Sequence, residues 1–140
     1  MSEPETHEGG CLCGAVRYRV AGPLGDAVYC HCALCRRANA APAVPWITVP
    51  PARFALTAGA PASYRSSDHG TRAFCAACGT QLTFRTTQRP DDVDVTLCSL
   101  DRPQDATPAY HIWSESRLPW LRLDEHLPAH AGASPADGQD

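Results

Sequence analysis

Alternation of apolar and polar residues with a period of two is the main pattern along this chain. In the segment "AVRYRV", Val16, Tyr18 and Val20 fall on one face, and Arg17 and Arg19 fall on the other. Successive side chains of an extended strand point to opposite faces, so this period is the one expected of a β-strand. The segment is therefore predicted to be a strand with one buried face.

The same alternation recurs in "LTFRT" and in "DVDVTLCSL", where Val93, Val95 and Leu97 face one way. Thirteen prolines and ten glycines separate such runs, and no long stripe with a period of 3.6 residues is found. One short helix is expected, beginning near Cys32 and running through "CALCRRA". These patterns predict a mostly β domain built of short strands and turns.

The length of the chain sets the number of domains. A chain of 140 residues can bury one hydrophobic core but not two. Residues 1–8 and 129–140 are small and polar with few apolar side chains, so both segments are expected to be disordered. The single domain is expected to span residues 9–128.

Composition and charge exclude several functional classes. No run of about 18 apolar residues is present, so no transmembrane helix is expected. The first ten residues, "MSEPETHEGG", lack the apolar segment of a signal peptide, which favours a cytoplasmic protein. The net charge is −3 and the arginines are scattered, so the chain lacks the basic stripe of a nucleic-acid-binding protein.

Eight cysteines in such a chain require an explanation. An even number of cysteines is compatible with disulfides, but these need an oxidising compartment. The spacing favours metal binding, because two thiolates on one tight turn can reach the same ion. The cysteines fall into C-x-C at 11/13, C-x-C-x-x-C at 30/32/35, C-x-x-C at 75/78, and a single Cys98.

Two of the cysteine pairs end in a glycine, Gly14 in "CLCG" and Gly79 in "CAACG". Glycine provides a positive φ angle after the last ligand of a metal-binding turn without steric cost. Both pairs also adjoin predicted strands, the second between the two arms of a hairpin. The sequence therefore predicts one closed structural zinc site, the alternative being four unrelated buried cysteines. Its ligands are Cys11, Cys13, Cys75 and Cys78.

The remaining triplet, Cys30, Cys32 and Cys35, offers three sulfur ligands. Catalytic zinc sites commonly have three protein ligands and one open position. A site with three thiolates is soft and suits a thiol as its fourth ligand. The alternative is a closed structural site, whose fourth ligand would be one of Cys98, His31, His69 and His111.

Several segments together resemble the glutathione-dependent formaldehyde-activating enzyme family, which also includes centromere protein V. The similarity covers about residues 9–128 and rests on "GGCLCGAVRYRV", "CHCALCRR", "RAFCAACGTQL", "SLD" and "HIWSESRLPWLRLDEHLP". The resemblance implies a β-tent fold of packed antiparallel sheets and two zinc ions per chain. It implies a structural zinc at Cys11, Cys13, Cys75 and Cys78, and a catalytic zinc at Cys30, Cys32 and Cys35.

The resemblance also implies a reaction, the joining of glutathione and formaldehyde to S-hydroxymethylglutathione by a carbon–sulfur lyase. We expect the open zinc position to bind a thiol and lower its pKa, so that the thiolate adds to a small aldehyde. The alternative is a two-zinc module that binds a partner protein and catalyses nothing.

Four other residues near the triplet or outside the pattern need an interpretation. Arg36 and Arg37 are the nearest cationic candidates for a substrate carboxylate, although they can equally be solvated surface residues. His31 is expected to lie beside the metal ligands or to be exposed, and not to act as a general base. Cys98 is expected to be a buried free thiol.

Overall fold

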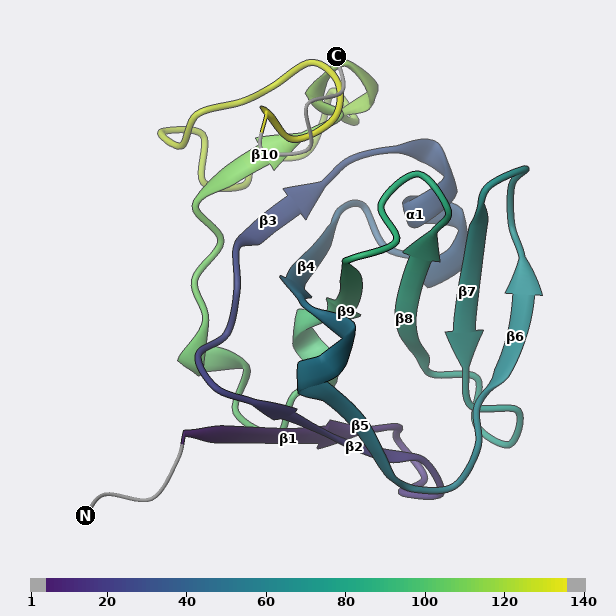
Figure 1. Cartoon of the computed structure of the whole chain (residues 1–140). Coiled ribbons are helices and arrows are strands. Elements are labelled where there is room, and N and C mark those ends of the chain that lie inside the picture. The colour runs from purple at the N-terminus through teal and green to yellow at the C-terminus, as the bar shows by residue number, and fades with distance from the viewer. Residues whose placement is uncertain (1–4, 136–140) are drawn as a thin grey trace.

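The computed structural model describes residues 5–135, which form two β-sheets and one α-helix (Figure 1). The smaller sheet lies across the base of the molecule in Figure 1 and has the order β1-β2-β5. Its antiparallel strands are β1 (Thr6–Gly10), β2 (Arg17–Ala21) and β5 (Phe54–Ala58). The prediction of a mostly β fold with short strands is confirmed.

The larger sheet has seven strands in the order β10-β3-β4-β9-β8-β7-β6. Adjacent strands of this sheet pair in antiparallel fashion, except that β10 pairs in parallel with β3. This one pairing departs from the expectation of all-antiparallel sheets. The strands are β3 (Ala27–Cys30), β4 (Val44–Val49), β6 (Ala62–Arg65), β7 (Gly70–Phe74), β8 (Gln81–Thr86), β9 (Val93–Thr96) and β10 (Tyr110–Ile112). Short 3₁₀ turns are η1 (Pro51–Arg53), η2 (Leu97–Ser99), η3 (Pro103–Asp105) and η4 (Ser114–Ser116).

The main core lies between the two sheets. Val16, Tyr18 and Val20 are buried in it, as their alternation predicted, whereas Arg19 is exposed. A second apolar cluster, which includes Trp46, lies with the helix on the other side of the large sheet. Because the large sheet is covered on both faces, all four residues of its central strand β9 are buried, including the polar ones.

The one α-helix of the described residues, α1 (Ala33–Asn39), begins where the sequence predicted it. Cys32 is the N-cap, and its sulfur accepts a hydrogen bond from the Cys35 backbone N–H at 3.3 Å. The helix ends at Asn39, and its C-cap Ala40 has a left-handed φ of 49°. Cys35 is the buried residue of the helix, so α1 presents this thiol to the interior.

The ordered structure extends beyond the expected bounds of 9–128. Residues 6–8, predicted to be disordered, belong to β1, whose backbone pairs with β2 from Thr6 to Gly10. Backbone hydrogen bonds do not require apolar side chains, which is why the composition did not reveal this strand. Ala129 likewise pairs with His111, and the Ser134 hydroxyl lies 2.6 Å from the Tyr110 hydroxyl.

The other parts of the two segments predicted to be disordered, 1–4 and 136–140, lie outside the described residues. Within residues 5–135, no helix is long and apolar enough to cross a membrane.

Candidate metal centres

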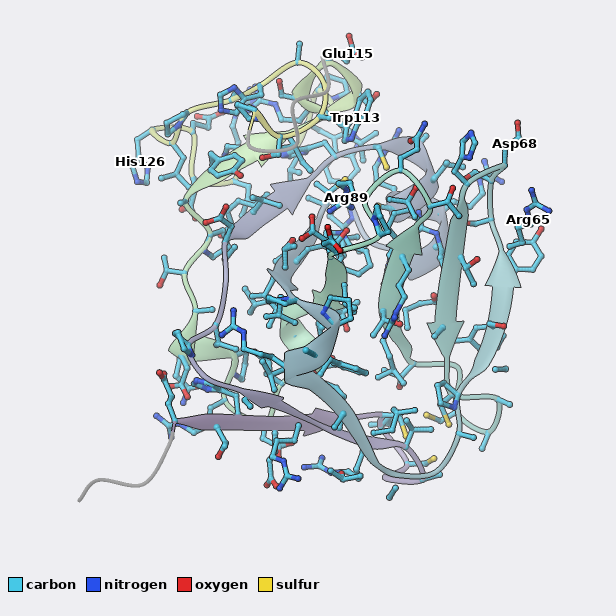
Figure 2. All side chains as sticks on the ribbon, in the orientation of Figure 1. Arg65, Asp68, Arg89, Trp113, Glu115 and His126 are labelled. Carbon is cyan, nitrogen blue, oxygen red and sulfur yellow. The ribbon has the colours of Figure 1, made fainter. Side chains whose placement is uncertain are left out.

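Seven of the eight cysteine sulfurs gather at two separate places, which we call the four-cysteine cluster and the three-cysteine cluster (Figure 2). Within each cluster, all ligand atoms lie within 4.8 Å of one another. The four-cysteine cluster contains Cys11, Cys13, Cys75 and Cys78, and the three-cysteine cluster contains Cys30, Cys32 and Cys35. The structure therefore brings together the two sets that the sequence predicted.

The four-cysteine cluster joins the two sheets. Cys11 and Cys13 lie in the turn between β1 and β2, and Cys75 and Cys78 lie in the turn between β7 and β8. Each turn is closed by a backbone hydrogen bond from its glycine to its first cysteine, 3.1 Å long in the first turn and 2.8 Å long in the second. The two glycines have φ angles of 82° and 83°, so the positive φ predicted for these turns is present.

Sulfur separations in both clusters fit a metal ion better than a disulfide. All eight cysteines are free thiols. The Cys13 sulfur lies 3.6 Å from the Cys11 sulfur and 3.8 Å from the Cys75 sulfur. The sulfurs of Cys30 and Cys35 are 3.5 Å apart. A tetrahedral zinc ion with bonds of about 2.3 Å places its sulfur ligands roughly 3.8 Å apart, whereas a disulfide bond is about 2.05 Å long.

Hydrogen bonds to two sulfurs of the four-cysteine cluster, those of Cys11 and Cys78, favour thiolates. The Cys11 sulfur accepts a hydrogen bond from the Val16 backbone N–H at 3.2 Å, and this bond lowers the pKa of Cys11. The Thr80 hydroxyl lies 3.3 Å from the Cys78 sulfur, and hydrogen bonds from Thr80 lower the pKa of Cys78 to about 5. Thiolates are the form of cysteine that binds metals, so this chemistry fits a resident ion.

The three-cysteine cluster is built on the passage from β3 to α1. Cys30 is the last residue of β3, Cys32 caps the helix, and Cys35 lies in the first helical turn. The sulfurs of Cys30 and Cys35 are buried, while Cys32 is half-buried. Hydrogen bonds from the other two thiols lower the pKa of Cys32, with smaller contributions from the Cys35 backbone N–H and the charge of Arg72.

None of the residues considered as a fourth ligand joins this cluster within the part of the chain that the structure describes. His31 and His111 bond to each other, and the Nδ1 atom of His69 lies 3.1 Å from the Thr87 hydroxyl. Cys98 lies in the η2 turn and is exposed, so the expectation that it is buried was wrong. The reason is that β9 ends at Thr96, where the strand alternation that had been extended to residue 98 stops.

A pair of buried histidines adjoins the three-cysteine cluster, because His31 lies between Cys30 and Cys32 in the chain. The Nε2 atom of His31 lies 2.8 Å from Nδ1 of His111, whose Nε2 lies 3.0 Å from the Asp124 carbonyl oxygen. A carbonyl oxygen only accepts, so the His111 Nε2 atom carries a proton and donates it to Asp124. Burial, and then the proximity of His111, lower the pKa of His31 to about 4. His31 is therefore neutral at pH 7, and its bond to His111 fixes the chain between Cys30 and Cys32 against β10.

The sequence reasoning did not select Arg72, a buried residue of β7. Its Nη2 lies 3.7 Å from the Cys35 sulfur, its Nε donates to the Ser66 hydroxyl at 3.1 Å, and its guanidinium carbon lies 4.7 Å from the centre of the Phe84 ring. Nothing in the sequence separates it from the other arginines except its place in the "TRAFC" stretch, which ends at Cys75.

The two arginines expected near a substrate carboxylate lie on α1. Arg36 is half-buried and its Nε donates to the His31 carbonyl oxygen at 3.3 Å, so part of its role is to hold the turn before the helix. Arg37 is exposed.

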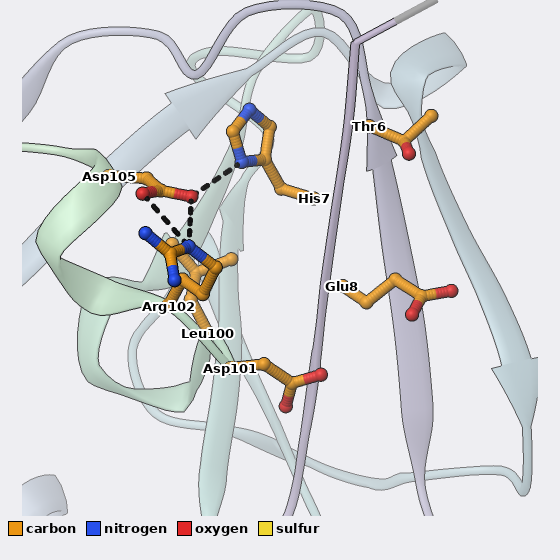
Figure 3. A pocket seen from close by; sticks show the side chains of 7 residues that line it. All are labelled: Thr6, His7, Glu8, Leu100, Asp101, Arg102 and Asp105. Carbon is orange, nitrogen blue, oxygen red and sulfur yellow. Dashed lines mark hydrogen bonds and ion pairs between the residues drawn. The ribbon is translucent and has the colours of Figure 1, made fainter. Parts of the chain in front are cut away.

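A surface pocket of about 250 Å³ lies elsewhere, between β1 and the η3 turn (Figure 3). Most of its charged groups are paired: Asp105 contacts both His7 and Arg102, and Asp101 pairs with Arg17. None of its lining residues belongs to either cysteine cluster; they are Thr6, His7, Glu8, Leu100, Asp101, Arg102 and Asp105.

The fold and the two clusters define a β-sheet protein with two thiol-rich sites that could each hold a metal ion, one of four sulfurs and one of three. The family model described as "Glutathione-dependent formaldehyde-activating enzyme" matches residues 6–116, and the chain belongs to this family. The structure is also similar to the crystal structure of a Rhodobacter sphaeroides protein solved as a structural-genomics target. The sequence identity is 25% and the TM-score 0.58, over 72% of this chain and 97% of that one.

Proposed function

We propose that this protein is a zinc-dependent carbon–sulfur lyase that acts on the thiol adduct of a small aldehyde, of the type formed by glutathione and formaldehyde. The observation that carries the proposal is the three-cysteine cluster, which has no fourth ligand among residues 5–135. Membership of the glutathione-dependent formaldehyde-activating enzyme family supports this choice of substrate. A cytoplasmic location, where thiols stay reduced, is part of the proposal.

The two clusters have different roles in this proposal. The four-cysteine cluster is a closed site that fastens the β1–β2 turn to the β7–β8 turn, and its zinc is structural. Cys30, Cys32 and Cys35 hold the catalytic zinc and leave one position for an exogenous ligand.

When bound at the three-cysteine cluster, zinc supplies a positive charge that holds a substrate sulfur as a thiolate at neutral pH. The chain contributes position and environment. The Cys32 cap fixes two of the sulfurs relative to each other, and Cys30 and Cys35 pack in the apolar cluster that includes Val44 and Trp46. The hydrogen bond between His31 and His111 holds the intervening backbone against β10, and the low pKa of His31 keeps this residue neutral beside the cluster.

The overall reaction is an addition without oxidation or reduction. The sulfur of the thiol forms a bond to the aldehyde carbon, the carbon–oxygen π bond breaks, and the proton lost by sulfur ends on the resulting hydroxyl oxygen. The reverse reaction breaks the carbon–sulfur bond and returns the thiol and the aldehyde. The main contribution of such a site to the rate is to hold the two reactants side by side.

Isotope exchange tests this function directly. The rate of exchange between ¹³C-formaldehyde and S-hydroxymethylglutathione is measured by NMR with and without protein, because the uncatalysed reaction also proceeds. Wild-type protein and the Cys98→Ala variant should accelerate exchange equally, because Cys98 lies outside both clusters. The Cys32→Ala variant should show only the background rate.

Exchange at the background rate with wild-type protein that carries two zinc ions would contradict the lyase proposal. If added thiols also failed to enter the zinc coordination at the three-cysteine cluster, a non-catalytic two-zinc interaction module would be the better description.

A further inference from the structure

Arg72 is an unusual residue in this fold, because it places a permanently charged side chain in the interior. Its relative exposure is 5%, and it reaches the three-cysteine cluster from β7, through a contact between Nη2 and the Cys35 sulfur at 3.7 Å. A buried charge is costly unless it is paired and hydrogen-bonded. The thiol-rich cluster is therefore the group that can pair with this buried positive charge.

The hydrogen bonds of Arg72 within residues 5–135 leave one donor atom unused. Nε donates to the Ser66 hydroxyl and Nη2 lies against the Cys35 sulfur, but Nη1 is buried without a hydrogen-bond partner in the described part of the chain. A guanidinium group is a rigid plane, so Nη1 sits beside Nη2 in the same buried neighbourhood. An unsatisfied buried donor of a charged group indicates an acceptor that binds there.

Phe84 helps to hold the guanidinium in position. The guanidinium carbon lies over the aromatic ring, 4.7 Å from its centre, in a cation–π contact. This contact and the Ser66 hydrogen bond anchor the group at two points, and neither of them uses Nη1. The free donor is thus presented by a fixed side chain.

The charge of the cluster indicates what kind of acceptor Arg72 would serve. Three thiolates and one divalent zinc ion have a net charge of minus one, and a fourth thiolate makes it minus two. A neutral water in the fourth position adds no charge. A buried guanidinium beside the cluster therefore favours the thiolate over water.

We propose that Arg72 is a specificity-determining residue of the three-cysteine cluster, whose Nη1–H donates to the sulfur of the exogenous thiolate and makes the site select anionic sulfur ligands. This inference rests on the proposed function, because it requires an exchangeable position at that cluster. It assigns the discrimination to the sulfur itself and not to the carboxylates of a substrate such as glutathione.

Thiol binding to protein with cobalt in place of zinc tests the inference without measuring activity. Sulfur-to-cobalt charge-transfer absorption is followed while 2-mercaptoethanol, which has no carboxylate, or glutathione is added. In the Arg72→Met variant, the affinity for both thiols should fall by the same factor, roughly 10- to 100-fold for a lost hydrogen bond to a charged group. Metal content should remain two ions per chain.

Two variants serve as controls. Arg85→Met removes the same charge from an exposed position on the neighbouring strand β8 and should leave both affinities unchanged. Arg72→Lys keeps a cationic donor and should bind both thiols more tightly than Arg72→Met. It also provides a test if the methionine variant does not fold, since Arg72→Lys should then still bind both thiols more weakly than wild type and by the same factor.

The outcomes separate this inference from the proposed function. Unchanged thiol affinity in Arg72→Met would overturn the inference alone, as would a loss confined to glutathione, which would place Arg72 at a carboxylate. Loss of the second metal from Arg72→Met without thiol would also overturn it, because Arg72 would then serve the resident cysteines. Failure of wild-type protein to bind any thiol at the metal would overturn the proposed function and this inference together.

Discussion

At the scale of single residues, burial and hydrogen bonding decide which side chains could be the fourth ligand of the three-cysteine cluster. His31 and His111 are 0% and 2% exposed, and their mutual hydrogen bond leaves neither free to turn toward the three-cysteine cluster without breaking it. Cys98 is exposed in a different turn. These placements favour water or an exogenous thiol, and not a side chain, as the fourth ligand of the cluster.

Replacement of either of two candidate fourth ligands, Cys98 and His111, should therefore leave the second zinc ion bound. In both Cys98→Ala and His111→Ala, X-ray absorption should still report three protein sulfurs at that metal in the absence of added thiol. His111→Ala should nevertheless lower the free energy of unfolding by about 2–4 kcal/mol, because it leaves a cavity and removes the partner of His31. Loss of the second zinc from Cys98→Ala would instead show a shell closed by four thiolates.

Gly79 is a residue whose importance is conformational. Its φ is 83°, and a Cβ atom added there would meet nothing within 4 Å. Gly79→Ala should thus lower the free energy of unfolding only by the cost of a left-handed conformation, about 1–2 kcal/mol. Gly79→Asn should cost less, because asparagine tolerates this conformation.

Urea unfolding of the zinc-loaded proteins measures both changes. Equal losses for alanine and asparagine would show that steric contact, and not backbone conformation, sets the cost at this turn.

At the scale of elements, the two clusters differ in what they connect. The four-cysteine cluster links turns from two different sheets, and the cysteines that meet there are 62 residues apart in the case of Cys13 and Cys75. The three-cysteine cluster links only β3 to the helix that follows it. Loss of the first connection should affect the whole fold, and loss of the second should affect a short segment.

Matched cysteine replacements test this difference. Cys75→Ala should unfold or aggregate the protein, because metal binding at a structural site contributes directly to the free energy of folding. Cys32→Ala should remain folded with one zinc ion, measured by circular dichroism and metal analysis. If Cys32→Ala melted as readily as Cys75→Ala, both clusters would be structural.

The features that the sequence predicted well are those encoded within a few residues. The alternation at Val16, Tyr18 and Val20, the cysteine spacings and the helix after Cys32 each depend on local geometry. Features that depend on distant contacts were missed. Arg72 contacts Cys35 only because β7 lies near α1, and β1 exists because its backbone pairs with β2.

At the scale of the whole molecule, the two metals should leave in order. A chelator should first remove the ion held by three sulfurs, with little change in the far-ultraviolet circular dichroism, and remove the second ion only as the protein unfolds. Simultaneous measurement of released zinc and circular dichroism checks this sequence of events. Loss of secondary structure together with the first ion would contradict the division into a catalytic and a structural site.

The parallel pairing of β10 with β3 has a consequence for the synthesis of the chain. His31, directly after β3, and its partner His111 on β10 are 80 residues apart, so translation at about 5–20 residues per second separates them by roughly 4–16 s. During that interval the outer edge of β3 has no β10 to pair with, and an open strand edge can pair with another chain. A nascent chain is thus prone to aggregate before β10 emerges, and a fragment that ends before residue 110 would keep that exposed edge permanently.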